Sequence, residues 1–109
     1  MMSQQLIELL DILRVRTVMY IGELSITRFG AYIRGFFHAV YLREPGLIHS
    51  KCYLHEFTKV LAKKYTIKAM LGWSDILLQV SNNNDEAALE LFWKEWDEFC
   101  KLQDLEVLR

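Results

Sequence analysis

The sequence predicts an all-α fold, a single-domain irregular bundle of about five helices over residues 1–109 with a short extended segment near residues 16–21. Three observations lead to this fold class. A chain of 109 residues has the length of one domain and can bury one apolar core. Hydrophobic residues make up 52% of the chain and recur mainly at helical spacing, while five Gly and one Pro leave few breaks. No two stretches form a clear pair of strands.

The first helix is expected from about residue 3 to residue 13. Ser3 is its N-cap, and four apolar residues share one face: Leu6, Ile7, Leu10 and Leu13. The helical period then breaks, in a run of residue types that favour extended backbone: Thr17, Val18, Tyr20 and Ile21. Gly22 permits the turn that ends this run. We expect Met19, Tyr20 and Ile21 to cross the surface of the bundle and plug its end.

Ser25 is expected to cap a second helix that continues to about residue 41. Its apolar stripe has spacings of four, three and four, at Phe29, Ile33, Phe36 and Val40. The small Gly35 should let another helix approach closely. After a turn at residues 44–46, a third helix is expected from about residue 50 to residue 65, with an inward face of Leu54, Phe57, Val60, Leu61 and Tyr65.

The segment from Trp73 to Ser81 is ambiguous, because its run DILLQV fits either a short helix capped by Ser74 or a buried strand. Three Asn residues at 82–84 then form a turn and cap the final helix, which is expected from Asp85 to about Gln103. Acidic residues in its first turn suit the helix macrodipole. Its inward stripe is Ala88, Leu89, Phe92, Trp96, Phe99 and Cys100.

Charge is distributed unevenly along the chain. The formal net charge is −1, but residues 82–109 carry eight acids and three bases, whereas the first 81 residues carry six acids and ten bases. A balance near zero gives no electrostatic reason to expect nucleic acid or a membrane as partner. No apolar run approaches the ~18–20 residues of a membrane span, and no secretion signal is visible. Two cysteines in no paired pattern suit a reducing compartment, so we expect a cytoplasmic protein.

Residues capable of chemistry are few. Cys52 and His55 form a close pair, with His38 and His49 elsewhere, but a structural zinc site needs a second close pair. A nucleophilic Cys–His pair also needs a third group that orients the base. We therefore expect no metal, no cofactor and no enzymatic activity. The alternative, a reactive Cys52, predicts that a measurable activity is lost in Cys52→Ser.

The acidic final helix is the candidate binding surface. Glu90, Asp97 and Asp104 are seven residues apart and share one stripe, with lysines interleaved. This pattern fits a solvated helix face, and it also fits a docking surface for a basic partner. The candidate partner-binding residues, with Trp93 as an aromatic anchor, are Glu86, Glu90, Trp93, Glu95, Asp97, Glu98 and Asp104.

One stretch carries a resemblance to a known family. The run RTVMYIGELSITRFGAYIRGFF resembles the start of small helical bacterial immunity proteins, with the pattern R-x-x-M-Y-I-G-x-x-S-x-x-x-L/F-x-x-F/Y-I-x-G-F/Y. The matching residues are Arg16, Met19, Tyr20, Ile21, Gly22, Ser25, Phe29, Tyr32, Ile33, Gly35 and Phe36. The later matches are Trp73-Ser74 and the set Ala88, Phe92 and Phe99. The first run also resembles part of the topoisomerase-type ATPase domain, but the Gly-rich Asp motif of that domain is absent.

The resemblance implies a cytoplasmic, non-enzymatic protein of a polymorphic toxin system such as contact-dependent growth inhibition. Such a protein binds the C-terminal domain of its cognate toxin in a 1:1 heterocomplex and blocks the toxin's active site. If the toxin is a nuclease, its substrate groove is basic, so the acidic final helix is the expected contact. The alternative function is a generic interaction or regulatory module, such as an adaptor or an antitoxin.

Overall fold

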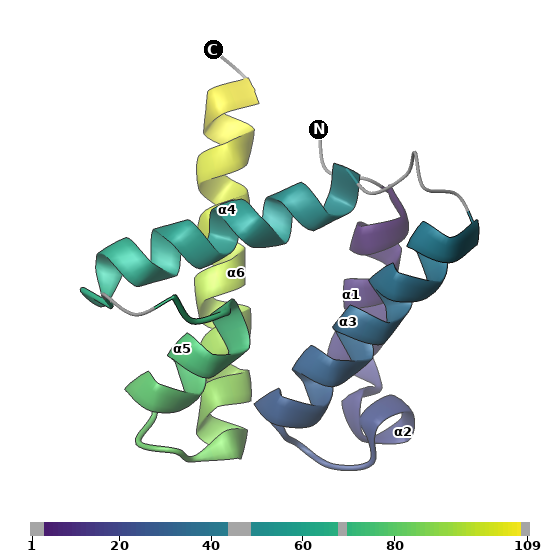
Figure 1. Cartoon of the computed structure of the whole chain (residues 1–109), viewed down its shortest axis with the longest axis horizontal. Coiled ribbons are helices and arrows are strands. Elements are labelled where there is room, and N and C mark those ends of the chain that lie inside the picture. Colours follow the sequence, from purple (N-terminus) through teal and green to yellow (C-terminus); the bar gives the residue numbers. More distant parts are fainter. Residues whose placement is uncertain (1–3, 44–48, 68–69, 108–109) are drawn as a thin grey trace.

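The computed structural model describes residues 4–43, 49–67 and 70–107, and within these ranges the side chains of 6–40, 42–43, 54–67 and 70–102. The described part of the chain forms helices and contains no strand, which confirms the all-α prediction (Figure 1). The helices are α1 (Gln4–Val15), α2 (Thr17–Ile21), α3 (Ile26–Arg43), α4 (His49–Lys64), α5 (Trp73–Val80) and α6 (Asp85–Val107). The ambiguous segment at residues 73–81 is therefore helical over Trp73–Val80.

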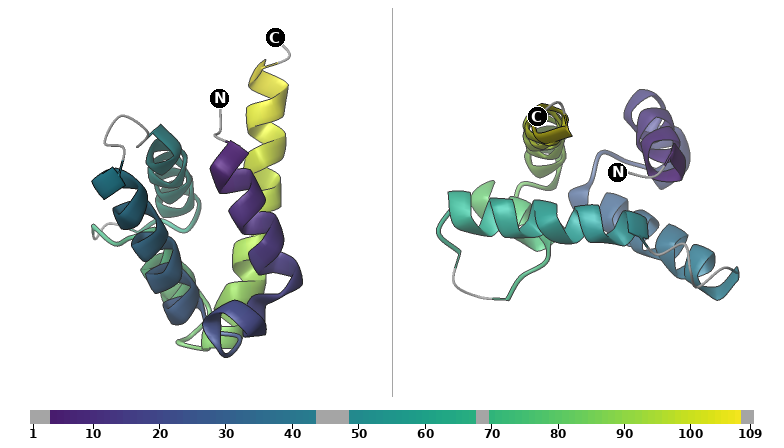
Figure 2. Two further views of the ribbon diagram at one scale, coloured as in Figure 1. Left: turned by 90° about the vertical axis from the view of Figure 1, so that its right-hand side faces the viewer. Right: turned by 90° about the horizontal axis from the view of Figure 1, so that it is seen from above.

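The helices lie in two layers. α3, α4 and α5 form one layer, while α1 and α6 lie behind them, and the views in Figure 2 agree on this arrangement. α4 crosses the long α6 at a steep angle, and α2 lies at the base of the molecule, where it packs against α1 and α3. The main apolar stripes of the longer helices are buried between the layers, as helices of this size require.

The core is dominated by aromatic rings gathered around Phe92 of α6. The Phe92 ring lies 4.8 Å from the ring of Phe29 in α3, 5.6 Å from that of Phe57 in α4 and 5.1 Å from that of Trp73 in α5. These three rings, like Phe92, are buried. Offset and edge-to-face contacts of this kind stabilise a core by more than their buried area alone. One residue of α6 therefore contacts three other helices.

The segment near residues 16–21 is a short helix, not the extended run that its β-branched residues predict. Arg16 breaks the helical geometry, with φ of −124° and ψ of 43°, and α2 follows at once. The Thr17 hydroxyl donates a hydrogen bond to the Leu13 carbonyl, and the Gly22 N–H donates to the Val18 carbonyl. These local bonds, together with burial of Thr17 and Ile21, override the weak β-propensity of the run.

The turn after α2 follows the prediction closely. Gly22 has a φ of +89°, a conformation that residues with a Cβ rarely adopt. The Arg28 guanidinium donates a hydrogen bond to the Ile21 carbonyl at the end of α2, 3.2 Å away. Ser25 caps α3, because its hydroxyl oxygen accepts a hydrogen bond from the Arg28 N–H at 3.1 Å. The family-like run thus forms a helix, a tight turn and a capped helix.

Two predictions about small residues are wrong, namely the close helix approach at Gly35 and the N-cap at Ser74. Gly35 has no atom within 4 Å of where a Cβ would lie, so it does not permit a close helix approach. Gly30, five residues earlier, has that role, since a Cβ there would lie 3.1 Å from the side chain of Ser74 in α5. Ser74 is buried in the first turn of α5, and Gly72 occupies the N-cap position expected for Ser74.

Candidate partner-binding surface on the last helix

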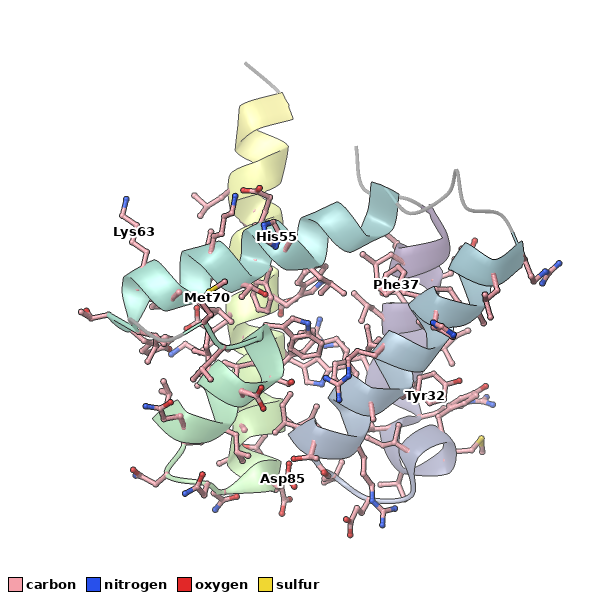
Figure 3. All side chains as sticks on the ribbon, viewed as in Figure 1. Tyr32, Phe37, His55, Lys63, Met70 and Asp85 are labelled. Atoms are coloured by element: carbon pink, nitrogen blue, oxygen red, sulfur yellow. The ribbon has the colours of Figure 1, made fainter. Side chains whose placement is uncertain are left out.

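The start of α6 is held by two side chains. The Asn84 Oδ1 accepts a hydrogen bond from the Ala87 N–H at 3.0 Å, which confirms the predicted cap. The Asp85 Oδ1 accepts a hydrogen bond from the Thr27 N–H at 2.9 Å, so this carboxylate also serves the start of α3 (Figure 3). Partial burial acts to raise the pKa of Asp85, but hydrogen bonds from Thr27 and Ser25 outweigh it and hold the pKa below its usual value.

Glu86 and Glu90 lie one turn apart on the exposed face of α6. In the part of the chain that the structure describes, neither carboxylate takes part in an ion pair or a side-chain hydrogen bond. Two like charges at i, i+4 repel each other weakly in the free helix. They therefore form an acidic pair that faces solvent, an arrangement that fits both a solvated helix face and a docking surface.

Glu95 does not belong to this face. Its side chain is only 4% exposed and lies between α6 and the end of α4. The Lys64 Nζ donates a hydrogen bond to Glu95 Oε1 at 2.7 Å, and the Tyr65 hydroxyl donates to the same oxygen at 2.9 Å. The bond to Glu95 raises the pKa of Lys64, while burial followed by the same carboxylate raises the pKa of Tyr65. Glu95 is thus a buried partner of α4.

Asp97 is bound within the molecule as well. Both of its oxygens accept hydrogen bonds from the Arg14 guanidinium of α1, at 2.9 and 2.6 Å. This paired arrangement lowers the pKa of Asp97, chiefly through the hydrogen bond, and raises that of Arg14. Glu98 lies 3.4 Å from Lys64 Nζ and is half exposed. Asp97 therefore connects α6 to α1, and Glu98 lies at the margin of the Glu95 contact.

Trp93 is half-buried and makes contacts within the molecule on more than one side. Its ring centroid lies 5.4 Å from that of Phe29 and 4.9 Å from that of Phe92. The Arg14 guanidinium carbon lies 5.0 Å from the ring centroid, so a cation–π contact covers one face. The side chain that binds Asp97 thus also covers Trp93.

A hollow of about 170 Å³ lies beside this contact, between α1 and α6. It is bordered by Ile7, Leu10, Asp11, Arg14, Trp93, Trp96, Asp97 and Cys100. The Arg14–Asp97 ion pair contributes to its wall, so two of the three charged side chains that line the hollow neutralise one another, and Asp11 is the third.

The seven candidate residues are thus divided among different environments. Glu86 and Glu90 are exposed, Glu98 is half exposed beside Lys64, Asp97 and Trp93 contact Arg14, and Glu95 is buried. Asp104 lies outside the described side chains. No protein-family model, curated protein or solved structure matches this chain. Fewer residues of α6 can contact a partner than the sequence pattern predicts. Among the seven candidates, Glu86 and Glu90 are the two exposed charges without an internal partner in the described chain.

The other candidate cluster is only partly described. His55 projects from the exposed side of α4, while the side chain of Cys52 lies outside the described residues (Figure 3). Over the side chains that the structure describes, no three His, Cys, Asp or Glu residues are grouped to hold a metal ion. Over the same part of the chain, no helix combines the length and apolar character needed to cross a bilayer.

Sequence reasoning missed an exposed apolar surface on α1 and α2. Met19, Tyr20 and Ile21 were expected to plug the end of the bundle, but only Ile21 is buried. Met19 and Tyr20 are exposed, as are Ile12, Val15 and Val18. Tyr20 contacts Tyr32 of α3 edge to face, with ring centroids 6.4 Å apart, beside this surface. Within α1 the signal was present in the spacing, since residues 12 and 15 lie three apart on the side away from Leu6, Leu10 and Leu13.

Proposed function

We propose that this chain is a cytoplasmic immunity protein, which binds the C-terminal domain of a cognate bacterial toxin in a 1:1 heterocomplex and blocks its active site. The resemblance of the run from Arg16 to Phe36 supports this role. The observation that carries the binding mode is the exposed pair Glu86 and Glu90, whose carboxylates have no internal partner in the described chain. A toxin nuclease offers a basic substrate groove, to which such a pair is complementary.

The acidic contact acts through charge. The free-energy cost of bringing these exposed carboxylates to a basic groove is small, because no internal ion pair is broken when the complex forms. Complementary charge accelerates association and makes the affinity depend on ionic strength. Asp97 and Glu95 are excluded from this contact, since their carboxylates already bind Arg14 and Lys64.

The experiment uses the double variant Glu86→Lys/Glu90→Lys and the toxin domain encoded beside this gene. We expect its affinity to fall by about tenfold or more, and its salt dependence to weaken, because two attractive charges become repulsive. The control is Glu56→Lys/Asp75→Lys, which makes the same change in net charge at exposed positions on α4 and α5.

Two outcomes contradict different parts of the proposal. Equal affinities of the two double variants would show that the α6 face is the wrong surface. Failure of the wild-type protein to co-purify with the neighbouring toxin domain, together with no protection of cells that express that domain, would reject the immunity function itself.

A further inference from the structure

The hollow between α1 and α6 has an apolar floor and a charged rim. These two helices lie behind α3, α4 and α5 (Figure 2) and are joined by the Arg14–Asp97 ion pair. Among the lining residues, Leu10 and Trp96 form the floor and are buried, whereas Ile7, Asp11 and Arg14 are exposed at the rim. A group that enters the hollow can pack on apolar side chains while its polar end stays at the rim.

The volume of the hollow suits a single side chain. Pockets for drug-sized ligands and cofactors have volumes of about 300–1,000 Å³, so a hollow of about 170 Å³ is too small for a ligand of that size. A cavity of ~150 Å³ is large enough to hold a benzene-sized group. The hollow therefore has the dimensions of a pocket for one long side chain of a partner protein.

The charge of the lining favours a cation. Arg14 and Asp97 neutralise one another, which leaves the carboxylate of Asp11 as the excess charge. In the described part of the chain, Asp11 has no ion pair and no side-chain hydrogen bond. The pKa of Arg14 is raised chiefly by its hydrogen bond with Asp97, and the nearby charge of Asp11 adds to this effect. A positively charged occupant would give Asp11 a direct partner.

The aromatic part of the lining favours arginine over lysine. Trp93 and Trp96 border the hollow, and the Arg14 guanidinium already packs 5.0 Å from the ring centroid of Trp93. Arginine stacks on aromatic rings and binds carboxylates through a planar fork, whereas the lysine ammonium is a compact, strongly hydrated charge. Arginine is also enriched among the residues that anchor protein interfaces.

The hollow lies on the same side of α6 as the acidic pair Glu86 and Glu90. Residues 86, 90, 93, 97 and 100 follow one another at spacings of four, three, four and three, so they lie along one side of the helix. The last three of these residues line the hollow. Glu90 and Asp97 are about 10 Å apart along the helix axis. A partner that contacts the acidic pair therefore comes within reach of the hollow.

We propose that the hollow between α1 and α6 is a pocket for one arginine side chain of the toxin domain. The methylene groups of this arginine pack on Ile7, Leu10 and Trp96, and its guanidinium donates hydrogen bonds to the carboxylate of Asp11. The inference rests on the proposed immunity function, because that function supplies the partner. A toxin domain with a basic groove has arginine side chains on the surface that faces this protein.

A free arginine derivative tests the pocket without the toxin. The probe is Nα-acetyl-arginine amide, and its control is Nα-acetyl-citrulline amide, which has nearly the same shape but no charge. NMR follows the indole N–H signals of Trp93 and Trp96, which line the hollow, and of Trp73, which does not. We expect the arginine amide to shift the first two signals with a dissociation constant on the order of 1 mM, and the citrulline amide to bind at least ~5-fold more weakly.

The decisive variant for the toxin complex is Ile7→Lys. Ile7 is 37% exposed and lies four residues before Asp11, so a lysine there places a cation of the chain itself beside the carboxylate. We expect the affinity for the toxin domain to fall at least ~10-fold, because the arginine then meets an occupied and neutralised site. The matched control is Ile12→Lys, because Ile12 is 45% exposed on the same helix and does not line the hollow.

A second pair of variants tests the charge alone. Asp11→Asn should lower the affinity for the toxin domain by about 10-fold, because it removes the carboxylate that binds the guanidinium. Asp75→Asn makes the same change in net charge at an exposed position on α5 and should leave the affinity unchanged. Thermal unfolding of all four variants shows whether any loss of binding comes from a loss of folded protein.

The possible outcomes separate this pocket from the proposed function. Unchanged Trp93 and Trp96 signals with the arginine amide, or equal binding of the citrulline amide, would overturn the proposal. Equal affinities of Ile7→Lys and Ile12→Lys for the toxin domain would also overturn it, and would leave the immunity function intact. No binding between the wild-type chain and the toxin domain would instead reject the immunity function, and this inference with it.

Discussion

Glu95 shows how polarity misleads at the scale of a residue. The buried positions Ala88, Phe92 and Phe99 of α6 continue through residue 95 at spacings of four, three and four, so periodicity alone places Glu95 inside. Its charge argues for the surface instead. The structure reconciles the two through Lys64 and Tyr65, about thirty residues earlier in the chain, which satisfy the carboxylate. That pairing is a tertiary contact, and no local pattern in the sequence predicts it.

Lys64 bridges two carboxylates of different exposure, which gives a matched pair of variants. Glu95→Gln should lower the free energy of unfolding by about 2 kcal/mol, because it removes a charged hydrogen-bond acceptor from a buried site. Glu98→Gln should lower it by less than about 0.5 kcal/mol, because the Glu98 carboxylate is half exposed and water replaces its ion pair. Urea unfolding at neutral pH measures both. Equal costs would mean that Glu95 is solvated in solution.

At the scale of an element, periodicity predicted the existence of the long helices, left α5 open between helix and strand, and gave the wrong conformation for α2. The limits of α3, α4 and the start of α6 lie within two residues of those expected, because each has an apolar stripe several turns long. α2 has only five residues, too few for a period to be visible, and its β-branched content favoured the wrong conformation. Its helix depends on contacts from α1, Gly22 and Arg28, which the local pattern does not encode.

The two glycines of α3 give a test at this scale. Gly35→Ala should raise the free energy of unfolding by about 0.5–1 kcal/mol, because alanine favours helix and the added methyl group meets nothing. Gly30→Ala should lose that gain, because its Cβ would lie 3.1 Å from Ser74 and force α3 away from α5. Thermal unfolding of the two single variants compares them directly. Equal stabilisation by both would show that the α3–α5 contact is looser than the structure describes.

At the scale of the whole molecule, the fold class follows from composition and periodicity, but the contacts that join the halves of the chain do not. Arg14 and Asp97 are 83 residues apart, and Thr27 and Asp85 are 58 apart. Each pair joins an N-terminal helix to α6, and each consists of residue types that are ordinarily solvated. The candidate site could be predicted only in part for the same reason. In the sequence, a carboxylate that forms an internal ion pair cannot be distinguished from one that faces solvent and can bind a partner.

These two long-range contacts predict how the molecule responds to acid. The pKa of Asp97 is lowered by its hydrogen bonds with Arg14, and that of Asp85 is lowered by hydrogen bonds that outweigh its burial, both from an ordinary value of 3.8. A carboxyl group with a depressed pKa binds its proton more readily in the unfolded chain. Its stabilisation is therefore complete above the unfolded pKa and is lost as the pH falls through the lower, folded pKa.

Asp97→Asn should remove one of these contributions. At neutral pH it should cost about 0.5–1 kcal/mol, since the ion pair is half exposed. As the pH falls below 3.8 and through the still lower folded pKa of Asp97, the variant and the wild type should converge, because the wild-type carboxyl group then becomes protonated as well. Asp75→Asn, at an exposed position on α5, is the control for the loss of one negative charge. Urea unfolding at several pH values gives these differences.

A difference in the free energy of unfolding between wild type and Asp97→Asn that stays constant from neutral to strongly acid pH would contradict this prediction. It would show that the ion pair with Arg14 is not what stabilises the contact between α1 and α6, and that the packing of Arg14 on Trp93 stabilises it instead.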